Sequence, residues 1–232
     1  MENIDWENLR EKITYINGDC MDYMKTIPDK YFQLAICDPP YGIERFKDAQ
    51  PTRLNRYGSM GTANDTKPDR KYFDELFRIS KNQVIWGYNH LSDLLPPTKE
   101  FVFWYKHQPV DTYSDGELAW TSFLKTAKCF DYPFFGATGR EFDRIHPTQK
   151  PVALYKWLLT NYAKQGDKIL DTHVGSASSL IACYDMGFDA VGFELDADYY
   201  KASKQRLEDF MRQPKLEELV FQEREQEAIE LA

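Results

Sequence analysis

The chain has 232 residues, a formal net charge of -8 and four scattered cysteines. This length suits one α/β domain over residues 1–232, and we expect neither a signal peptide nor a membrane span, which needs an apolar run of roughly 20 residues. Cysteines without a close pair argue against a zinc site and for a reducing compartment, so we expect a metal-free, cytoplasmic protein.

The first part of the chain alternates short strands and helices before a long polar segment. The pattern predicts a strand over residues 13–16, a short helix over 21–27 and a buried strand over 33–37. Residues 43–70 are rich in Gly, Pro, Asn and Arg, and we expect a long mobile loop there.

That loop has a local excess of positive charge, although the whole chain is acidic. Between Arg45 and Lys71 there are seven basic residues and three acidic ones. The net charge of the chain argues weakly against a nucleic-acid partner, because phosphate contacts need Lys and Arg. The basic segment has two interpretations: a contact surface for phosphates or an ordinary solvated loop.

The remaining sequence predicts further alternation with one irregular stretch. Residues 106–145 are expected to be irregular because Pro and Gly interrupt them repeatedly. The predicted elements are a helix over 71–79, strands over 83–86 and 101–104, a helix over 151–163, a strand–helix–strand unit over 168–172, 178–186 and 190–194, and a last helix over 198–211. This order favours a mostly parallel sheet covered by helices on both faces.

A carboxylate, two prolines and an aromatic ring follow the strand over 33–37 directly. Open α/β sheets bind their ligands at this end of their strands. Asp38 and the carbonyl of Pro39 suit the acceptance of hydrogen bonds from an exocyclic amino group, and Tyr41 suits stacking on its ring. An ordinary strand-to-loop turn is the alternative. The candidate catalytic residues are Asp38, Pro39, Pro40 and Tyr41.

A second group of residues follows the strand over 168–172. Small residues around Gly175 let the backbone approach a ligand closely. Glu194 comes 19 positions later, at a spacing used to hold ribose hydroxyls. Because the loop has one glycine and Asp171 repels phosphate, an adenosine ligand with a cationic tail fits better than a dinucleotide. S-adenosylmethionine matches that description; a tight turn with a solvent-facing Glu194 is the alternative.

Two weaker signals accompany this loop. Lys150 precedes a helix and suits neutralisation of a ligand carboxylate, with Thr148 as a further donor. Asp19 follows the first strand and suits acceptance of a hydrogen bond from an adenine amino group. Each pattern is common on protein surfaces, so neither identifies a site by itself.

Taken in order, these motifs resemble the amino-group DNA methyltransferases of the permuted β class, in which the catalytic Asp-Pro-Pro-Tyr precedes the cofactor loop. The resemblance spans roughly residues 13–210, and residues 115–120 are also similar to shorter phage-type adenine methylases. The matching segments are Asn17-Gly18-Asp19, residues 38–41, His146 to Pro151, Asp171 to Ser178 and Gly192-Phe193-Glu194.

The resemblance implies a Rossmann-like, S-adenosylmethionine-dependent methyltransferase fold with a mostly parallel seven-stranded sheet. It implies methylation of N6 of a flipped adenine in double-stranded DNA, a short target-recognition insertion over 105–145, and it allows a homodimer. The implied DNA contacts are Arg45, Lys47, Arg53, Arg56, Arg140 and Arg144. The implied cofactor-binding residues are Asp19, Cys20, Asp38, His146, Thr148, Lys150, Asp171, His173, Gly175, Ser176, Ser178, Glu194 and Leu195.

Ala177 departs from the family pattern, which usually has glycine at this position. If the position needs a positive φ or a very close approach of the cofactor, cofactor affinity should fall. Two alternatives stay open. Cytosine N4 presents the same amino geometry as adenine N6, and a non-catalytic DNA-binding subunit would tolerate Ala177.

Overall fold

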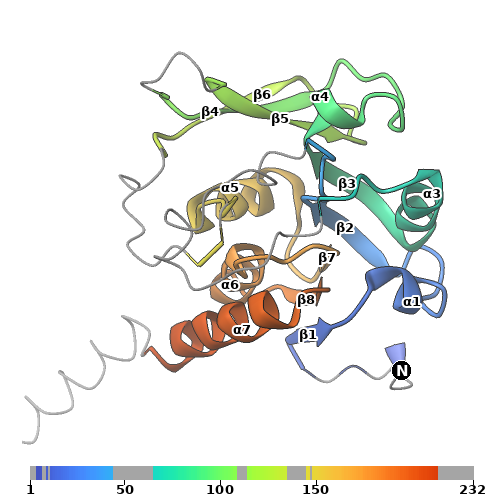
Figure 1. Ribbon diagram of the computed structural model, residues 1–232, viewed down its shortest axis with the longest axis vertical. Helices are drawn as coiled ribbons and strands as arrows, with labels where there is room; N and C mark the ends of the chain where they lie inside the picture. Colours follow the sequence, from blue (N-terminus) through green and yellow to red (C-terminus); the bar gives the residue numbers. More distant parts are fainter. Residues whose placement is uncertain are drawn as a thin grey trace, which may run out of the picture.

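The computed structural model describes residues 4–6, 9, 11–43, 65–108, 114–134, 145–146 and 148–213. These residues form one eight-stranded sheet in the order β1-β8-β7-β2-β3-β5-β4-β6 (Figure 1). The strands are β1 (Ile13–Asn17), β2 (Phe32–Cys37), β3 (Ser80–Trp86), β4 (Phe101–Tyr105), β5 (Gly116–Thr121), β6 (Lys128–Asp131), β7 (Lys168–Asp171) and β8 (Asp189–Glu194).

Helices cover both faces of the sheet, as the alternation of elements predicts. One buried cluster joins α5, α6 and α7 to the sheet, and the other joins α1, α3 and α4 to it (Figure 1). The helices are α1 (Cys20–Met24), α3 (Arg70–Ile79), α4 (Tyr88–Leu91), α5 (Val152–Tyr162), α6 (Ser178–Asp185) and α7 (Ala197–Arg212).

The helix α3 illustrates how the sequence determines an element. Asp69 caps its amino end, because its side chain accepts a hydrogen bond from the Tyr72 amide at 3.2 Å. The helix then buries Tyr72, Phe73, Leu76 and Ile79, whose spacing places them on one face. That face packs on the sheet, and the polar face is left to solvent.

Strands β1, β8, β7, β2 and β3 pair in parallel, so their carboxyl ends lie along one edge. The chain continues from β2 outward to β3 on one side and from β7 outward to β8 on the other. The point between β2 and β7 is therefore a topological switch point, where open α/β sheets bind ligands. Asp38 follows β2 and Asp171 ends β7, so both flank this point.

Two corrections to the sequence-based expectations concern the far side of the sheet. Within the described ranges the sheet has eight strands rather than seven, and the stretch expected to be irregular contains β5 and β6. β5 is antiparallel to both β3 and β4. Gly116 was expected to interrupt regular structure, but it is the first residue of β5. Glycine is needed at this position because a Cβ would meet the carbonyl oxygen of Trp104 at 2.1 Å.

Among the residues that the structure describes, no helix has the length and apolar character needed to cross a membrane.

Candidate active site

The catalytic motif predicted from the sequence begins one residue after β2. The Asp38 side chain is 16% exposed and both of its oxygens are engaged. Oδ1 accepts a hydrogen bond from the Tyr41 hydroxyl, and Oδ2 accepts one from the Lys150 ammonium. The carboxylate is thus fixed from two directions at the switch point of the sheet.

Tyr41 is held by contacts with a turn that follows β3. Its ring stacks on His90, with centroids 5.2 Å apart and an interplanar angle of 15°. Gly87 caps α4 with φ +78°, and a Cβ at this glycine would lie 2.1 Å from Tyr41 Cε1. The amides of Tyr41 and Gly42 donate to Asp65 Oδ1 at 3.2 and 3.0 Å. Ring and backbone are both fixed, and only glycine fits beside the ring.

A chain of buried and partly buried charges extends from Asp38 into the β4–β5 pair. The Lys150 side chain is 3% exposed, and its ammonium lies 3.1 Å from Glu117 Oε2. The other oxygen of Glu117 pairs with Lys106. Although burial opposes the charge of Lys150, the carboxylates of Asp38 and Glu117 hold its pKa above the ordinary value. Burial also opposes the charge of Glu117, but Lys150 and Lys106 hold its pKa well below the ordinary value.

The predicted cofactor loop begins at the end of β7. Asp171 is buried and accepts hydrogen bonds from the His173 amide at 3.0 Å and the Ser179 hydroxyl at 2.5 Å. Burial raises the pKa of Asp171 to about 7, and burial lowers the pKa of His173 to about 4. Ser176 in the loop and Ser178 at the start of α6 are both buried, with hydroxyl oxygens 3.1 Å apart.

Glu194 ties this loop to the end of β8. Its carboxylate accepts hydrogen bonds from the Gly175 amide at 2.8 Å and the Asp196 amide at 2.9 Å. Burial raises the pKa of Glu194 above its usual value. The neighbouring Leu195 is 55% exposed. A carboxylate has about four acceptor sites, so capacity is left for ribose hydroxyls.

Ala177 has a positive φ, the backbone conformation for which the family pattern usually has glycine. It has φ 61° and ψ 16°, in the left-handed region, and its side chain is completely buried. The position therefore does require a positive φ, at a cost on the order of 1 kcal/mol for a residue with a Cβ. Its effect on cofactor affinity stays a prediction.

The weaker signals also lie near this edge. The His146 ring packs on the Tyr199 ring, with centroids 4.3 Å apart. The hydroxyl oxygen of Thr148 lies 3.0 Å from Nδ1 of His146. Asp19 is exposed at the amino end of α1 and accepts from the Met21 amide at 2.9 Å. Cys20 is buried, and burial raises the pKa of its thiol.

The six arginines and lysines predicted to contact DNA lie outside the described residues, as does most of the loop predicted over 43–70. The described part of the target-recognition segment is residues 105–108, 114–134 and 145. No group of three potential metal ligands occurs within the described ranges.

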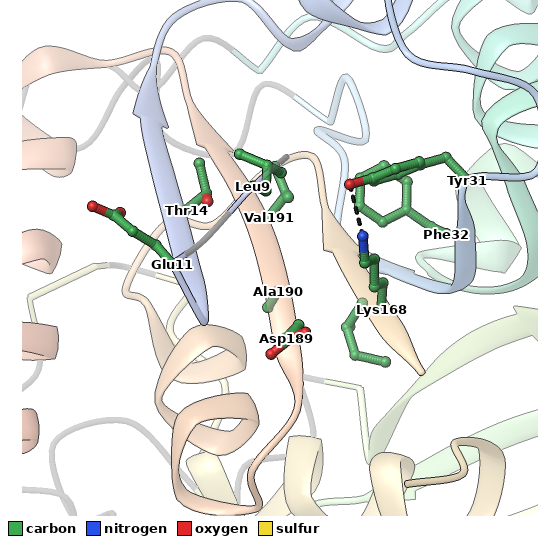
Figure 2. A pocket seen from close by; sticks show the side chains of 10 residues that line it. Leu9, Glu11, Thr14, Tyr31, Phe32, Lys168, Asp189, Ala190 and Val191 are labelled. Carbon is green, nitrogen blue, oxygen red and sulfur yellow. Dashed lines mark hydrogen bonds between the residues drawn. The ribbon is translucent and has the colours of Figure 1, made fainter. Parts of the chain in front are cut away.

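A small pocket at the opposite end of the sheet is separate from this site. Figure 2 shows its lining at the beginnings of β2, β7 and β8, where Lys168 donates to the Tyr31 hydroxyl at 2.9 Å. Because the catalytic motif follows the carboxyl end of β2, this pocket does not contribute to it.

Sequence reasoning missed four residues that surround the motif, namely Glu117, Lys106, Gly87 and His90. The similarity of residues 115–120 to phage-type methylases was the one sequence signal near Glu117. The other three had none, because their contacts with the motif arise only when β3, β4 and β5 pair beside β2.

Comparisons with known proteins agree on one family. The sequence pattern of a DNA methylase family directed at N6 and N4 matches residues 80–205. DNA adenine methyltransferase YhdJ of Escherichia coli K12 is 25% identical, covering 85% of this chain and 83% of that protein. Type II methyltransferase M.HpaI of Haemophilus parainfluenzae is 35% identical, and the match covers 83% of this chain and 73% of that protein.

Solved structures share the fold. The M1.HpyAVI–SAM complex matches with a TM-score of 0.58 at 19% identity, covering 84% of this chain and 98% of that one. The PvuII DNA methyltransferase, described as cytosine-N4-specific, matches with a TM-score of 0.56 at 13% identity. The match covers 88% of this chain and 94% of that one.

Proposed function

Since this chain belongs to the family of N6- and N4-directed DNA methylases, we propose that it transfers a methyl group from S-adenosylmethionine to N6 of adenine in double-stranded DNA. The observation that carries the proposal is the position of Asp38. Its carboxylate follows β2 at the switch point of the sheet, at the same edge as Asp171, which ends the neighbouring β7, and Glu194, which ends β8.

The residues at this edge suit S-adenosylmethionine as the methyl donor. The acidic side chains of Asp19, Asp171 and Glu194 lie at or just after the carboxyl ends of β1, β7 and β8, which are neighbours in the sheet, and they disfavour a dinucleotide phosphate. The loop from Gly175 to Ser178 has only small side chains. When bound, the cofactor supplies an electrophilic methyl group on a positively charged sulfur.

Asp38 and Pro39 have the central role in the proposed reaction. The lone pair of an aromatic amino group is delocalised into the ring, so the nitrogen is a weak nucleophile. Hydrogen bonds to the Asp38 carboxylate and the Pro39 carbonyl draw that nitrogen toward tetrahedral geometry. They also stabilise the positive charge that grows on it, which is electrostatic preorganisation. Alignment of the nitrogen with the methyl group supplies the rest of the acceleration.

Tyr41 is proposed to stack on the target base. A base inside a duplex is out of reach of Asp38, so it must be flipped out of the helix or already unpaired. An aromatic–base stack contributes about 1–3 kcal/mol and offsets part of the lost stacking. His90 lies parallel to the Tyr41 ring, so the base must take the opposite face or displace the imidazole.

The choice of adenine rests on relatives rather than on the site. YhdJ is described as an adenine methyltransferase, whereas the PvuII enzyme is described as cytosine-N4-specific. Asp38 accepts equally well from either amino group. We propose adenine because YhdJ matches over most of both chains, while the PvuII likeness at 13% identity supports the fold alone.

The DNA contacts and the oligomeric state are proposals of the same kind. The basic residues between Arg45 and Arg56 are proposed to bind the phosphate backbone. The short segment over 105–145 leaves room for relaxed sequence specificity or for contacts from a second subunit. A DNA substrate is in keeping with the cytoplasmic location expected from the sequence.

The proposal is tested by incubation of the chain with unmodified DNA and S-adenosylmethionine, followed by base-resolved modification sequencing. We expect N6-methyladenine in a defined sequence context. N4-methylcytosine would correct the base while keeping the reaction. An absence of any DNA modification would refute the proposed activity, and a failure to bind S-adenosylmethionine as well would favour the non-catalytic subunit.

A further inference from the structure

The ammonium of Lys150 lies between two carboxylates, and only one of them belongs to the catalytic motif. It donates to Asp38 Oδ2 and lies 3.1 Å from Glu117 Oε2. The Trp86 ring lies alongside, with its centroid 5.4 Å from the ammonium nitrogen. Because the side chain is 3% exposed, the loss of one carboxylate partner would leave the ammonium with little compensation from solvent.

The contact with Asp38 conflicts with the proposed chemistry. As methyl transfer proceeds, positive charge grows on the amino nitrogen that is bound to Asp38. An ammonium on the same carboxylate repels that charge and cancels the negative field that stabilises it. Lys150 must therefore leave Asp38, or weaken its contact, when the target base enters.

Glu117 has the capacity to take the ammonium over. Its Oε2 is buried and makes no well-aligned hydrogen bond within the described residues, although Lys150 is already near it. Its other oxygen is occupied by Lys106, which holds Glu117 in place on β5. Lys150 and Glu117 already form an ion pair, and a small rotation of the Lys150 side chain would align it as a hydrogen bond to Oε2.

We propose that Glu117 is a positioning residue: it accepts the ammonium of Lys150 when the amino group of the target base engages Asp38. The inference rests on the proposed function, because it assumes that Asp38 binds the target base. It assigns a role to a residue on β5, 79 positions away from the catalytic aspartate in the sequence. Glu117 acts on Asp38 only through Lys150.

The test is a double-mutant cycle on methyl transfer, measured at saturating cofactor and DNA. Glu117→Gln keeps the shape of the side chain but removes the charge that attracts Lys150. We expect kcat to fall about tenfold or more, while the cofactor Kd from calorimetry changes less than about twofold. In a Lys150→Met background the same Glu117→Gln change should alter kcat less than about twofold, because the ammonium is already gone.

Glu75→Gln is the matched control. Glu75 also forms an ion pair, with Arg78, and its side chain is 28% exposed compared with 27% for Glu117. It lies on α3 outside the charge chain, so kcat should stay at the wild-type value. If Glu117→Gln does not fold by circular dichroism, the Lys106→Met/Glu117→Gln double variant also removes Lys106, the partly buried lysine that the loss of the Glu117 charge leaves unpaired. That variant should show the same loss of kcat.

Three results overturn the inference: wild-type kcat in the Glu117 variants, an equal loss in both backgrounds of the cycle, or no transfer by cofactor-bound Lys150→Met. The last result would mean that the ammonium is needed on Asp38. Failure of the proposed function is distinguishable, because then the wild-type chain and the Glu75→Gln control would not methylate DNA either.

Discussion

Replacement of Gly87 by alanine tests whether the position of Tyr41 limits the reaction. The new Cβ would lie 2.1 Å from Tyr41 Cε1, whereas carbon atoms pack at about 3.5–4.0 Å. The ring must therefore retreat by more than about 1 Å, and its hydroxyl is pulled away from Asp38. Misplacement of a positioning group by about 1 Å lowers rates on the order of 100-fold. We expect a loss of kcat of that size.

The assay is single-turnover methyl transfer to DNA, with cofactor affinity measured in parallel by calorimetry. Gly87 has φ +78°, so the alanine also strains the backbone at a cost of about 1–2 kcal/mol. Gly166→Ala is the matched control, because Gly166 has φ +88° with no atom within 4 Å of a new Cβ. It should lose stability only through the backbone strain that both variants share, and it should keep its kcat. A folded Gly87→Ala variant with wild-type kcat would refute the argument.

Three further predictions concern the cofactor loop and the basic segment. Glu194→Ala should weaken S-adenosylmethionine binding about tenfold or more, and calorimetry showing unchanged affinity would remove Glu194 from the site. Burial raises the pKa of Asp171 from 3.8 to about 7, so the folded chain binds more protons than the unfolded chain between these values. The free energy of unfolding should therefore fall as pH rises from about 4 to about 7, by up to about 4 kcal/mol. Asp171→Asn should reduce this pH dependence of the free energy of unfolding, measured by urea denaturation. An equally steep decline in the variant would mean that a group other than Asp171 titrates. Replacement of Arg53 and Arg56 by glutamine should reduce the slope of log K for DNA binding against log salt concentration by roughly two units. An unchanged slope would favour the alternative interpretation of this segment as an ordinary solvated loop.

The parts of the fold that the sequence predicted are those with a strong local signal. The apolar run that became β2 and the amphipathic spacing of α3 were each sufficient to define an element. The strand β5 was missed because it begins with Gly116 and Glu117, which are not typical of strands. Both are explained by distant contacts: the Trp104 carbonyl leaves no room for a Cβ at 116, and Lys106 and Lys150 compensate the charge at 117.

The candidate site was predictable to the extent that it follows strand ends. Asp38, Asp171 and Glu194 were identified because each comes at the end of a buried strand, and the parallel pairing brings these ends to one edge. The partner of Lys150 was not predictable in this way. The ion pair with Asp38 joins residues 112 positions apart, and no local pattern indicates which carboxylate a buried lysine contacts. A contact between Lys150 and the cofactor carboxylate stays a prediction.

The most direct test of the account is methyl transfer to DNA by Asp38→Ala, at saturating cofactor. If Asp38 holds the target amino group, transfer should be lost by at least about 1,000-fold, or about 4 kcal/mol in the barrier. Cofactor affinity should stay nearly intact, because the loop from Asp171 to Ser178 and Glu194 are unchanged. Transfer at the wild-type rate, or loss of cofactor binding equal to the loss of transfer, would contradict the assignment of Asp38 to the target base.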